Sequence, residues 1–431
     1  MKNRGEDMHQ LARELWPLPR SITGHGVKDT LAILRRELGN LDIVNVPTGT
    51  DILDWTVPQE WWVNDAWIKT PDGRKICHFK AHNLHLLNSS VGIHEHMSLE
   101  ELDKHLYSLP DQPDAIPYRT SYFAPRWGFC IEHSVRETLA EGQYEVFIDA
   151  GHKPGHLTYG ELFIKGDREE EIFISTYICH PSMANNELSG PVVTTELAKW
   201  LLSLPERRYS YRIVFAPETI GAIAYIASNL EALKARVVAG FNLTCVGDER
   251  TYSFMPSRAG NTISDAVAQH VLKHLCGTFD AYGWRDRGSD ERQYCAPGVD
   301  LPVVSIMRSK YGTFPEYHTS LDDLDNLVTP EGLAGGFEAN RLALEILERN
   351  VTPVTNVIGE PFMSKRNLRP TLGGDNHNTG DFKLISDLIS MSDGSRSLLD
   401  IAEFLDVPAW ELYAPLDRLI DTGLISLAQR S

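Results

Sequence analysis

The sequence lacks long apolar runs, a cysteine framework and an excess of positive charge. No apolar run approaches the roughly 20 residues that a membrane-spanning helix needs, and the first residues contain no signal-peptide apolar region. The six cysteines are scattered, with no CxxC pair, which favours reduced thiols over disulfides. The formal net charge of -18 disfavours nucleic acid or an anionic membrane as a partner. We therefore expect a cytoplasmic protein that binds neither.

Two different textures make up most of the 431 residues. Residues 166–350 alternate apolar strands with amphipathic helices, a pattern typical of an α/β domain with a mainly parallel, mixed sheet and helices on both faces. Residues 42–130 instead contain short aromatic and β-branched runs between proline and glycine turns. We expect one α/β domain formed by residues 1–41 and 131–352, with residues 42–130 inserted as a β-rich subdomain.

The last segment, residues 353–431, reads as a linker followed by a small helical unit. Its pattern of helix, loop, helix, turn, helix and strand-like end predicts a winged helix. From Asp381 onward there are nine acidic residues and four basic ones, whereas a module that tracks phosphates needs the opposite balance. We expect this unit to serve packing or homo-oligomer formation rather than nucleic-acid binding.

Polar residues follow four of the predicted strands, at the point where each strand ends. In open α/β sheets, ligands bind in the crevice beyond the carboxyl ends of the strands. Two histidines and several carboxylates are therefore expected to meet at one edge of the sheet. The polar residues after the four strands are His180, Asn186, Glu187, Glu218, Asp248, Arg308 and Tyr311, with His318 further on.

Imidazole and carboxylate groups at such an edge suit a catalytic zinc ion, which takes about three protein ligands plus water. Glu218 follows a proline at the end of an apolar strand, where partial burial can raise its pKa, and is our candidate general base. Each residue also has a structural interpretation. A single histidine at a strand end is more often structural, and Glu218 can simply be an acid at a helix N-terminus. The coincidence of four strand ends favours the site.

Four motifs carry a resemblance to a known family: "CHPSMANNELSG", "PETIGAIAY", "RGSDERQYCAPGVDLPV" and "YGTFPEYHTSLDD". Together they resemble a bacterial aminopeptidase-like family. The resemblance implies a zinc-exopeptidase-like α/β domain, an inserted β subdomain and a C-terminal winged helix. The chain is also more distantly similar to the di-zinc aminopeptidases.

The resemblance to the di-zinc enzymes implies roles for several residues. Their first and last histidine ligands match His180 and His318, their general base matches Glu218, and their glycine-serine-aspartate element ends at Asp290. The remaining metal-binding carboxylates are missing. Their bridging aspartate, second glutamate and next ligand aspartate match the neutral residues Asn186, Thr219 and Thr244.

Neutral side chains cannot offset the repulsion between two dications about 3.5–4 Å apart, so we expect one zinc ion rather than two. Its expected ligands are His180, His318 and Glu187, and Asp248 is the reserve ligand.

The leading hypothesis is a zinc-dependent amide hydrolase, exopeptidase-like, acting on a small peptide or amide. The β insertion would form a wall or lid over the crevice. Arg292 and Arg308 are expected to hold a substrate carboxylate or phosphate, although a structural ion pair would explain them too. Two alternatives remain open: a non-catalytic protein that binds a peptide-like ligand in a degenerate site, and a zinc deacylase of an amino sugar or natural-product amide. The expected substrate-binding residues are Asn186, Asp290, Arg292, Arg308 and Tyr311.

Overall fold

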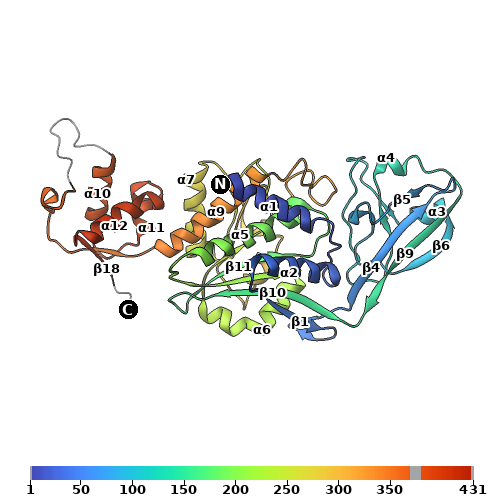
Figure 1. The fold of residues 1–431 in the computed structure, drawn as a ribbon, viewed down its shortest axis with the longest axis horizontal. Helices are drawn as coiled ribbons and strands as arrows, with labels where there is room; N and C mark the ends of the chain where they lie inside the picture. The colour runs from blue at the N-terminus through green and yellow to red at the C-terminus, as the bar shows by residue number, and fades with distance from the viewer. Residues whose placement is uncertain (1, 369–379, 429–431) are drawn as a thin grey trace. The chain divides into compact units, whose positions relative to one another are not determined.

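The computed structural model describes residues 2–368 and 380–428. The chain forms two compact units (Figure 1). The first consists of Met1–Asp265 and Phe279–Glu338, and the second consists of Ala266–Thr278 and Ala339–Ser431. Each unit has its own sheet and helices, and the candidate site residues all lie in the first.

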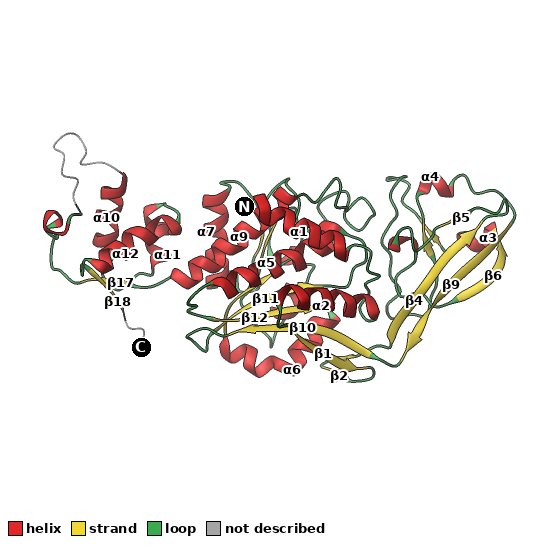
Figure 2. Cartoon of the chain, in the orientation of Figure 1, coloured by secondary structure: helices red, strands yellow, loops and turns green. Residues whose placement is uncertain are grey.

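An eight-stranded mixed sheet organises the first unit (Figure 2). Its central strands β12, β11, β13 and β16 run parallel, whereas the β1–β10, β10–β12 and β14–β16 pairs are antiparallel. The mainly parallel sheet expected from the sequence is therefore confirmed. In spatial order the strands are β1 (Asp42–Pro47), β10 (His156–Ile164), β12 (Ser210–Ala216), β11 (Glu171–Tyr177), β13 (Val237–Asn242), β16 (Val303–Met307), β14 (Ser253–Met255) and β15 (Asp280–Ala281).

Helices cover both faces of this sheet, as the fully apolar central strands require. Helices α1 (Lys2–Leu15), α2 (His25–Leu38) and α5 (Ser189–Ser203) lie together on one side, and α6 (Ile220–Arg236) lies on the other (Figure 1). The core under α6 contains Val214, Phe173 and Tyr225 among other buried side chains. The short helix α8 (Glu291–Tyr294) also packs near α6 and β16.

A second, antiparallel sheet forms the β-rich part of the same unit. Its strand order is β5 (Lys75–Ile76), β4 (Glu60–Lys69), β9 (Gln143–Lys153) and β6 (Ile93–Ser98). Two short strand pairs lie outside it, β2 (Asp51–Ile52) with β3 (Trp55–Thr56), and β7 (Leu106–Tyr107) with β8 (Phe129–Cys130). The short helices α3 (Leu99–Asp103) and α4 (His133–Arg136) complete this part.

The two sheets divide the chain at other points than residues 42 and 130. Strand β1 begins at Asp42 but pairs with β10 in the main sheet. Strand β9 was expected to rejoin the main sheet, yet it pairs with both β4 and β6. An alternating strand fits either sheet by its pattern alone, and only the long-range pairing decides between them.

The second unit contains the three helices of a winged helix, α10 (Gly380–Met391), α11 (Leu398–Leu405) and α12 (Tyr413–Asp421). The short strands β17 (Pro353–Thr355) and β18 (Ile425–Leu427) pair antiparallel beside them. This is the element order expected from the sequence. Part of the expected linker, residues 369–379, lies outside the described residues. Helices α7 (Ile263–Leu275) and α9 (Pro330–Arg349) begin in the first unit and end in the second.

Across residues 2–368 and 380–428, no helix combines the length and apolar character needed to cross a bilayer.

A π-helical turn, η2 (Ala184–Leu188), connects the end of β11 to α5, and all five of its residues are buried. Two of its backbone amides bind Asp322 instead of a partner within the helix. The Asp322 carboxylate accepts hydrogen bonds from Asn185 N at 2.6 Å and Asn186 N at 2.9 Å. A helical start leaves such amides without partners, so a buried carboxylate there holds the turn in place. Turns of this kind occur often at functional sites.

Gly190 allows α5 to approach the sheet closely behind this turn. A Cβ at this position would lie 2.6 Å from the carbonyl oxygen of Leu243 and closer still to the hydroxyl of Thr176. We predict that Gly190→Ala lowers the free energy of unfolding by about 1–3 kcal/mol, because the backbone must shift to relieve the overlap. Urea-induced unfolding measures it.

Gly283→Ala is the matched control, since Gly283 is exposed and its nearest heavy atom would lie 3.6 Å from an added Cβ. The control is expected to change stability by less than about 0.5 kcal/mol. Equal stability of the two variants would contradict the close approach.

Candidate active site

The parallel strands deliver the predicted residues to one edge of the main sheet. Cys179 and His180 follow β11, Glu218 follows β12, and Thr244 follows β13. Because the strands are parallel, their carboxyl ends face the same side, and the residues after them share one crevice.

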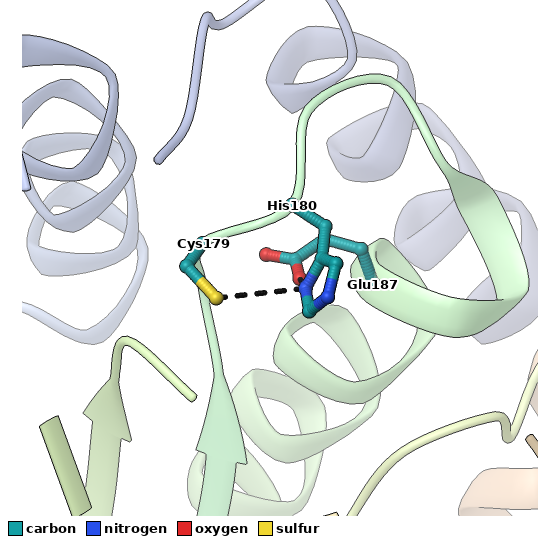
Figure 3. Close-up of side chains that lie close together, drawn as sticks. All are labelled: Cys179, His180 and Glu187. Carbon is teal, nitrogen blue, oxygen red and sulfur yellow. Dashed lines mark hydrogen bonds and ion pairs between the residues drawn. The ribbon is translucent and has the colours of Figure 1, made fainter. Parts of the chain in front are cut away.

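His180 is held by two buried charged side chains from other parts of the chain. Its Nδ1–H donates to Glu187 Oε2 at 2.9 Å, and its backbone oxygen accepts from Arg20 Nε at 2.9 Å. Arg20 Nε also lies 3.5 Å from Glu187 Oε1, and both side chains have no solvent exposure. Figure 3 shows Glu187 reaching from its helix to the imidazole, with the Cys179 sulfur directed at the same ring nitrogen, Nδ1. The contacts among Arg20, His180 and Glu187 fix the position of the His180 ring.

When Glu187 is ionised, its contact also fixes the tautomer of His180. With the proton on Nδ1, the Nε2 atom carries a free lone pair, the form in which imidazole binds metals. Burial, with a smaller effect of Arg20, lowers the pKa of His180 to about 3, so the ring is neutral at ordinary pH. Burial raises the pKa of Glu187 to about 8, although Arg20 acts in the opposite direction. Glu187 therefore serves His180 in the way that a carboxylate serves a metal-bound histidine.

His318 lies beside His180 with an unsatisfied nitrogen. The two ring centroids are 5.8 Å apart. Within the described part of the chain, the buried Nε2 atom of His318 has no hydrogen-bond partner. Burial lowers the pKa of His318 to about 3, so this ring is neutral as well. A buried polar atom without a partner carries a desolvation cost, which a bound ligand would remove.

Glu218 lies on the other side of His180. Its Oε2 atom is 3.6 Å from His180 Nε2, and its side chain is 21% exposed. Desolvation, followed by the charge of Asp290, raises the pKa of Glu218 well above its usual value. Asp290 accepts a hydrogen bond from the backbone N–H of Thr219 at 2.7 Å. It thereby supports Thr219, whose φ of 64° lies in the left-handed region that β-branched residues rarely adopt.

A cavity of about 430 Å³ opens onto His180 and Glu218. Arg292 is 40% exposed, lies 3.9 Å from Glu218 Oε1 and donates to Thr219 Oγ1 at 2.8 Å. Three aromatic side chains, Trp55, Tyr122 and Phe123, also line the cavity. The lining residues are Ile22, Trp55, Tyr122, Phe123, Cys179, His180, Glu218, Thr219, Ile220, Arg292 and Gln293. The cavity thus combines a carboxylate, a guanidinium and an aromatic surface around one imidazole.

Asn186 and Thr244 are joined by a tyrosine. The hydroxyl of Tyr177 is hydrogen-bonded to Thr244 Oγ1 at 2.5 Å and to Asn186 Oδ1 at 3.2 Å, and also to the backbone oxygen of Asn186. All three side chains are buried. These positions therefore hold neutral, mutually hydrogen-bonded groups and no carboxylate.

Asp248, Arg308 and Tyr311 do not line this cavity. The carboxylate of Asp248 accepts hydrogen bonds from Asn185 Nδ2 and from Ser309, and its backbone oxygen accepts one from Arg308 Nε. Tyr311 donates to a buried glutamate, Glu291, at 2.6 Å. We therefore propose structural roles for Asp248, Arg308 and Tyr311 in place of the reserve-ligand and substrate-binding roles expected from the sequence.

The described residues contain two groups of potential metal ligands. Within each group, the ligand atoms lie within 4.8 Å of one another. One joins Cys179, His180 and Glu187. Burial raises the pKa of the Cys179 thiol well above its usual value, so it stays protonated and is a poor ligand. His318 belongs to neither group among the described residues, but His180 and His318 are neighbouring neutral imidazoles, and neutral imidazole is a better zinc ligand than a protonated thiol. Rings bound to one zinc ion through nitrogens at about 2.1 Å have centres roughly 5–6 Å apart.

The other group, His270, His274 and Glu403, belongs to the second unit. His270 Nε2 accepts a hydrogen bond from Ala409 N at 2.9 Å, so its proton is on Nδ1, which donates to Glu403. Both nitrogens are therefore used, and this group fits a structural contact better than a metal.

Five residues at or near the site were not predicted from the sequence: Arg20, Tyr118, Tyr122, Tyr177 and Asp322. Arg20 lies in a loop next to a proline, where arginine is usually exposed. Its only signal was the apolar sequence around it. Tyr177 is part of an apolar strand, and its hydroxyl gives no sign in the sequence of facing Asn186. Asp322 was the easiest of the five to predict, because it is a carboxylate only four residues after the candidate ligand His318.

Family models match almost the whole chain. Residues 9–350 match the family described as "Domain of unknown function (DUF4910)", and residues 350–427 match a winged helix-turn-helix. A protein from Clostridium acetobutylicum, provisionally named a polysaccharide biosynthesis protein with an aminopeptidase-like domain, is 41% identical over 92% of this chain and 91% of its own.

Solved structures share the fold. A crystal structure of a provisionally named peptidase from Clostridium acetobutylicum has a TM-score of 0.90 and 38% identity, covering 99% of this chain and 97% of that one. A zinc aminopeptidase from Bacillus subtilis has a TM-score of 0.58 at 12% identity, covering 80% of this chain and 94% of that one. An aminopeptidase from Aneurinibacillus sp. strain AM-1 has a TM-score of 0.52 at 14% identity, covering 81% and 95%. The expected aminopeptidase-type fold and winged helix are confirmed.

The buried neutral histidines predict acid sensitivity of the metal-free protein. Their folded pKa values of about 3 lie below the unfolded value near 6.5, so the unfolded state binds more protons in this window. Stability is therefore lost as the pH falls from about 6.5 towards 3. In His318→Phe, the drop in unfolding free energy between about pH 6.5 and pH 5 should be smaller than in the wild type by about 1–2 kcal/mol. Urea unfolding in the presence of a chelator measures this; equal drops would contradict a buried neutral His318.

Proposed function

The chain belongs to the family described as Domain of unknown function (DUF4910), and from that premise we propose that it is a metal-dependent, peptidase-like amide hydrolase with a single zinc ion. The observation that carries the proposal is a pair of neighbouring neutral imidazoles, of which His180 lies beside Glu218. His180 presents a free Nε2 lone pair, and His318 Nε2 is buried without a partner among the described residues. The aminopeptidase-type fold of solved structures supports the same chemistry.

His180 and His318 would hold the ion through their Nε2 atoms. Glu187 was expected to be the third ligand, but its contact with His180 Nδ1 favours an orienting role instead. The two nitrogens of an imidazole point in diverging directions, so a carboxylate bound to Nδ1 does not reach an ion at Nε2. When bound, zinc polarises a carbonyl and lowers the pKa of a coordinated water.

One ion rather than two is supported by the Tyr177 contacts. Asn186 and Thr244 offer no negative charge, and the Tyr177 hydroxyl is hydrogen-bonded to Asn186 Oδ1 and Thr244 Oγ1. A second dication would need a bridging carboxylate at this point.

Glu218 would act as general base and then as general acid. A water that attacks the amide carbon loses its proton to Glu218 Oε2, and Glu218 returns the proton to the leaving nitrogen as the C–N bond breaks. The pKa of Glu218 is raised from its usual value in the direction of neutral pH, and a group that accepts and then returns a proton works best with a pKa near the working pH. Arg292, at the cavity wall, is placed to bind a carboxylate or phosphate on the substrate.

The substrate class is best sought among aminoacyl amides and acylated amino sugars. The aromatic wall of the cavity accepts either an apolar side chain or the face of a sugar ring. The provisional name of the 41% identical Clostridium acetobutylicum protein, which refers to polysaccharide biosynthesis, supports including the sugars.

Glu218→Gln tests this function directly. With a substrate found in such a screen, we predict that the variant loses at least about 100-fold in kcat while its zinc content stays unchanged, because only the proton-transfer group is removed. Glu231→Gln on the exposed face of α6 is the matched control and should behave as the wild type. Unchanged turnover in Glu218→Gln would sink the hydrolase and favour the alternative of a non-catalytic binding protein.

For the winged helix we propose packing or self-association, since nine acidic and four basic residues from Asp381 onward disfavour phosphate contact. Light scattering is expected to show an oligomer of the full chain. Salt-sensitive binding of duplex DNA, measured by fluorescence anisotropy, would contradict this role.

A further inference from the structure

A segment from the β-rich part of the first unit is fixed against the candidate active site. The backbone N–H of Tyr118 donates to the oxygen of His318 at 2.8 Å, and Ser320 N donates to Ile116 O at 2.9 Å. Pro117 and Thr319 form an antiparallel bridge between these two contacts. Residues 116–118 are thus attached to the chain around His318 as an additional short strand would be.

The ring of Tyr118 packs beside both histidines. Its centroid is 5.2 Å from that of His180 and 5.2 Å from that of His318. The side chain is buried, and its hydroxyl is hydrogen-bonded to the hydroxyl of Tyr122. Tyr118 therefore connects the pair of imidazoles to Tyr122.

Tyr122 extends this connection to the cavity, because it lines the same cavity as His180 and Glu218. Two hydroxyls share one hydrogen bond here, and the described residues offer neither hydroxyl another partner. One phenolic proton is consequently left over. When Tyr118 donates, the free proton is that of Tyr122 and is available to a molecule in the cavity. Burial raises the pKa of both phenols well above their usual value, so both stay protonated.

We propose that Tyr122, positioned by Tyr118, donates a hydrogen bond to the amide oxygen that becomes negatively charged during hydrolysis. This inference rests on the proposed function. As water oxygen bonds to the amide carbon, the C=O π electrons move to the oxygen, and the Tyr122 O–H stabilises that charge without losing its proton. Glu218 takes the water proton and delivers it to the nitrogen when the C–N bond breaks.

The need for this donor follows from the rest of the site. Asn186 and Thr244, both hydrogen-bonded to Tyr177, are neutral and offer no carboxylate for a second ion that would stabilise the oxyanion. An aligned donor in a partly dehydrated cavity is the usual substitute, and removing one typically costs about 100–1,000-fold in kcat. The β-rich part would then supply a catalytic group, beyond the wall or lid expected from the sequence.

Binding of methylphosphonate, a tetrahedral oxyanion, tests the donor without any need for turnover. Calorimetry is carried out on the zinc-reconstituted full chain. We expect Tyr122→Phe to weaken binding by about 10- to 100-fold, because one hydrogen bond to a charged oxygen is lost. Tyr118→Phe should weaken it less, since Tyr122 keeps its proton but loses its orienting partner. On an amide substrate, Tyr122→Phe should lower kcat about 100-fold and leave KM within roughly threefold.

Tyr144→Phe is the matched control, because the Tyr144 hydroxyl donates to Ala140 O at 2.7 Å in the small sheet, away from the cavity. It should bind methylphosphonate as the wild type does. Thermal unfolding confirms that each variant is folded. Equal affinity in Tyr122→Phe and the wild type, or no binding by the wild type, would overturn the inference. The proposed hydrolase would still stand if Glu218→Gln abolished turnover, so the two failures are distinguishable.

Discussion

The buried contact between Arg20, Glu187 and the histidine at the end of β11 is the interaction on which the rest of the site depends. Burying an arginine and a glutamate is costly unless each is paired and hydrogen-bonded. Here Arg20 donates to the backbone oxygens of Leu15 and His180, and Glu187 accepts from the His180 ring. The N-terminal loop, the strand end and the π-helical turn are thereby locked to one imidazole. Its tautomer and orientation, and hence any metal chemistry, follow from that arrangement.

The site differs from a two-metal centre, because neutral groups stand where the two-metal centre has charged carboxylates. Tyr177 is hydrogen-bonded to Asn186 and Thr244, where the di-zinc aminopeptidases are expected to have carboxylates. On the opposite side, Tyr118 and Tyr122 bring two more hydroxyls to the histidines and the cavity. Neutral groups in place of carboxylates reduce the negative charge that is available to bind metal ions. The hydroxyls also add neutral hydrogen-bond donors for an oxyanion. Under the proposed function, this chain would carry out hydrolysis with fewer metal ligands than a two-metal centre uses.

The sequence predicted the sheet and the strand-end residues well, because those signals are local. Apolar strands alternating with helices identify the fold, and His180, Glu218 and His318 follow from the motifs at the strand ends. The partners of these residues were not predictable in the same way. Arg20 reaches His180 across 160 positions, and arginine is rarely buried. Strand β9 has the alternating pattern of either sheet, and Asp248 looks like a ligand until its hydrogen bonds are known. Long-range packing decides each of these cases.

Zinc stoichiometry tests the account most directly. The full-length protein is stripped with a chelator, reconstituted with zinc, passed through a desalting column and analysed by plasma mass spectrometry. His318→Ala is compared with His152→Ala, whose ring hydrogen-bonds to Ser89 outside the lining of the His180 cavity. The account predicts one zinc ion per chain in the wild type and in His152→Ala, and none in His318→Ala. Two ions in the wild type would contradict the reading of Asn186 and Thr244, and none would contradict the metal-dependent mechanism.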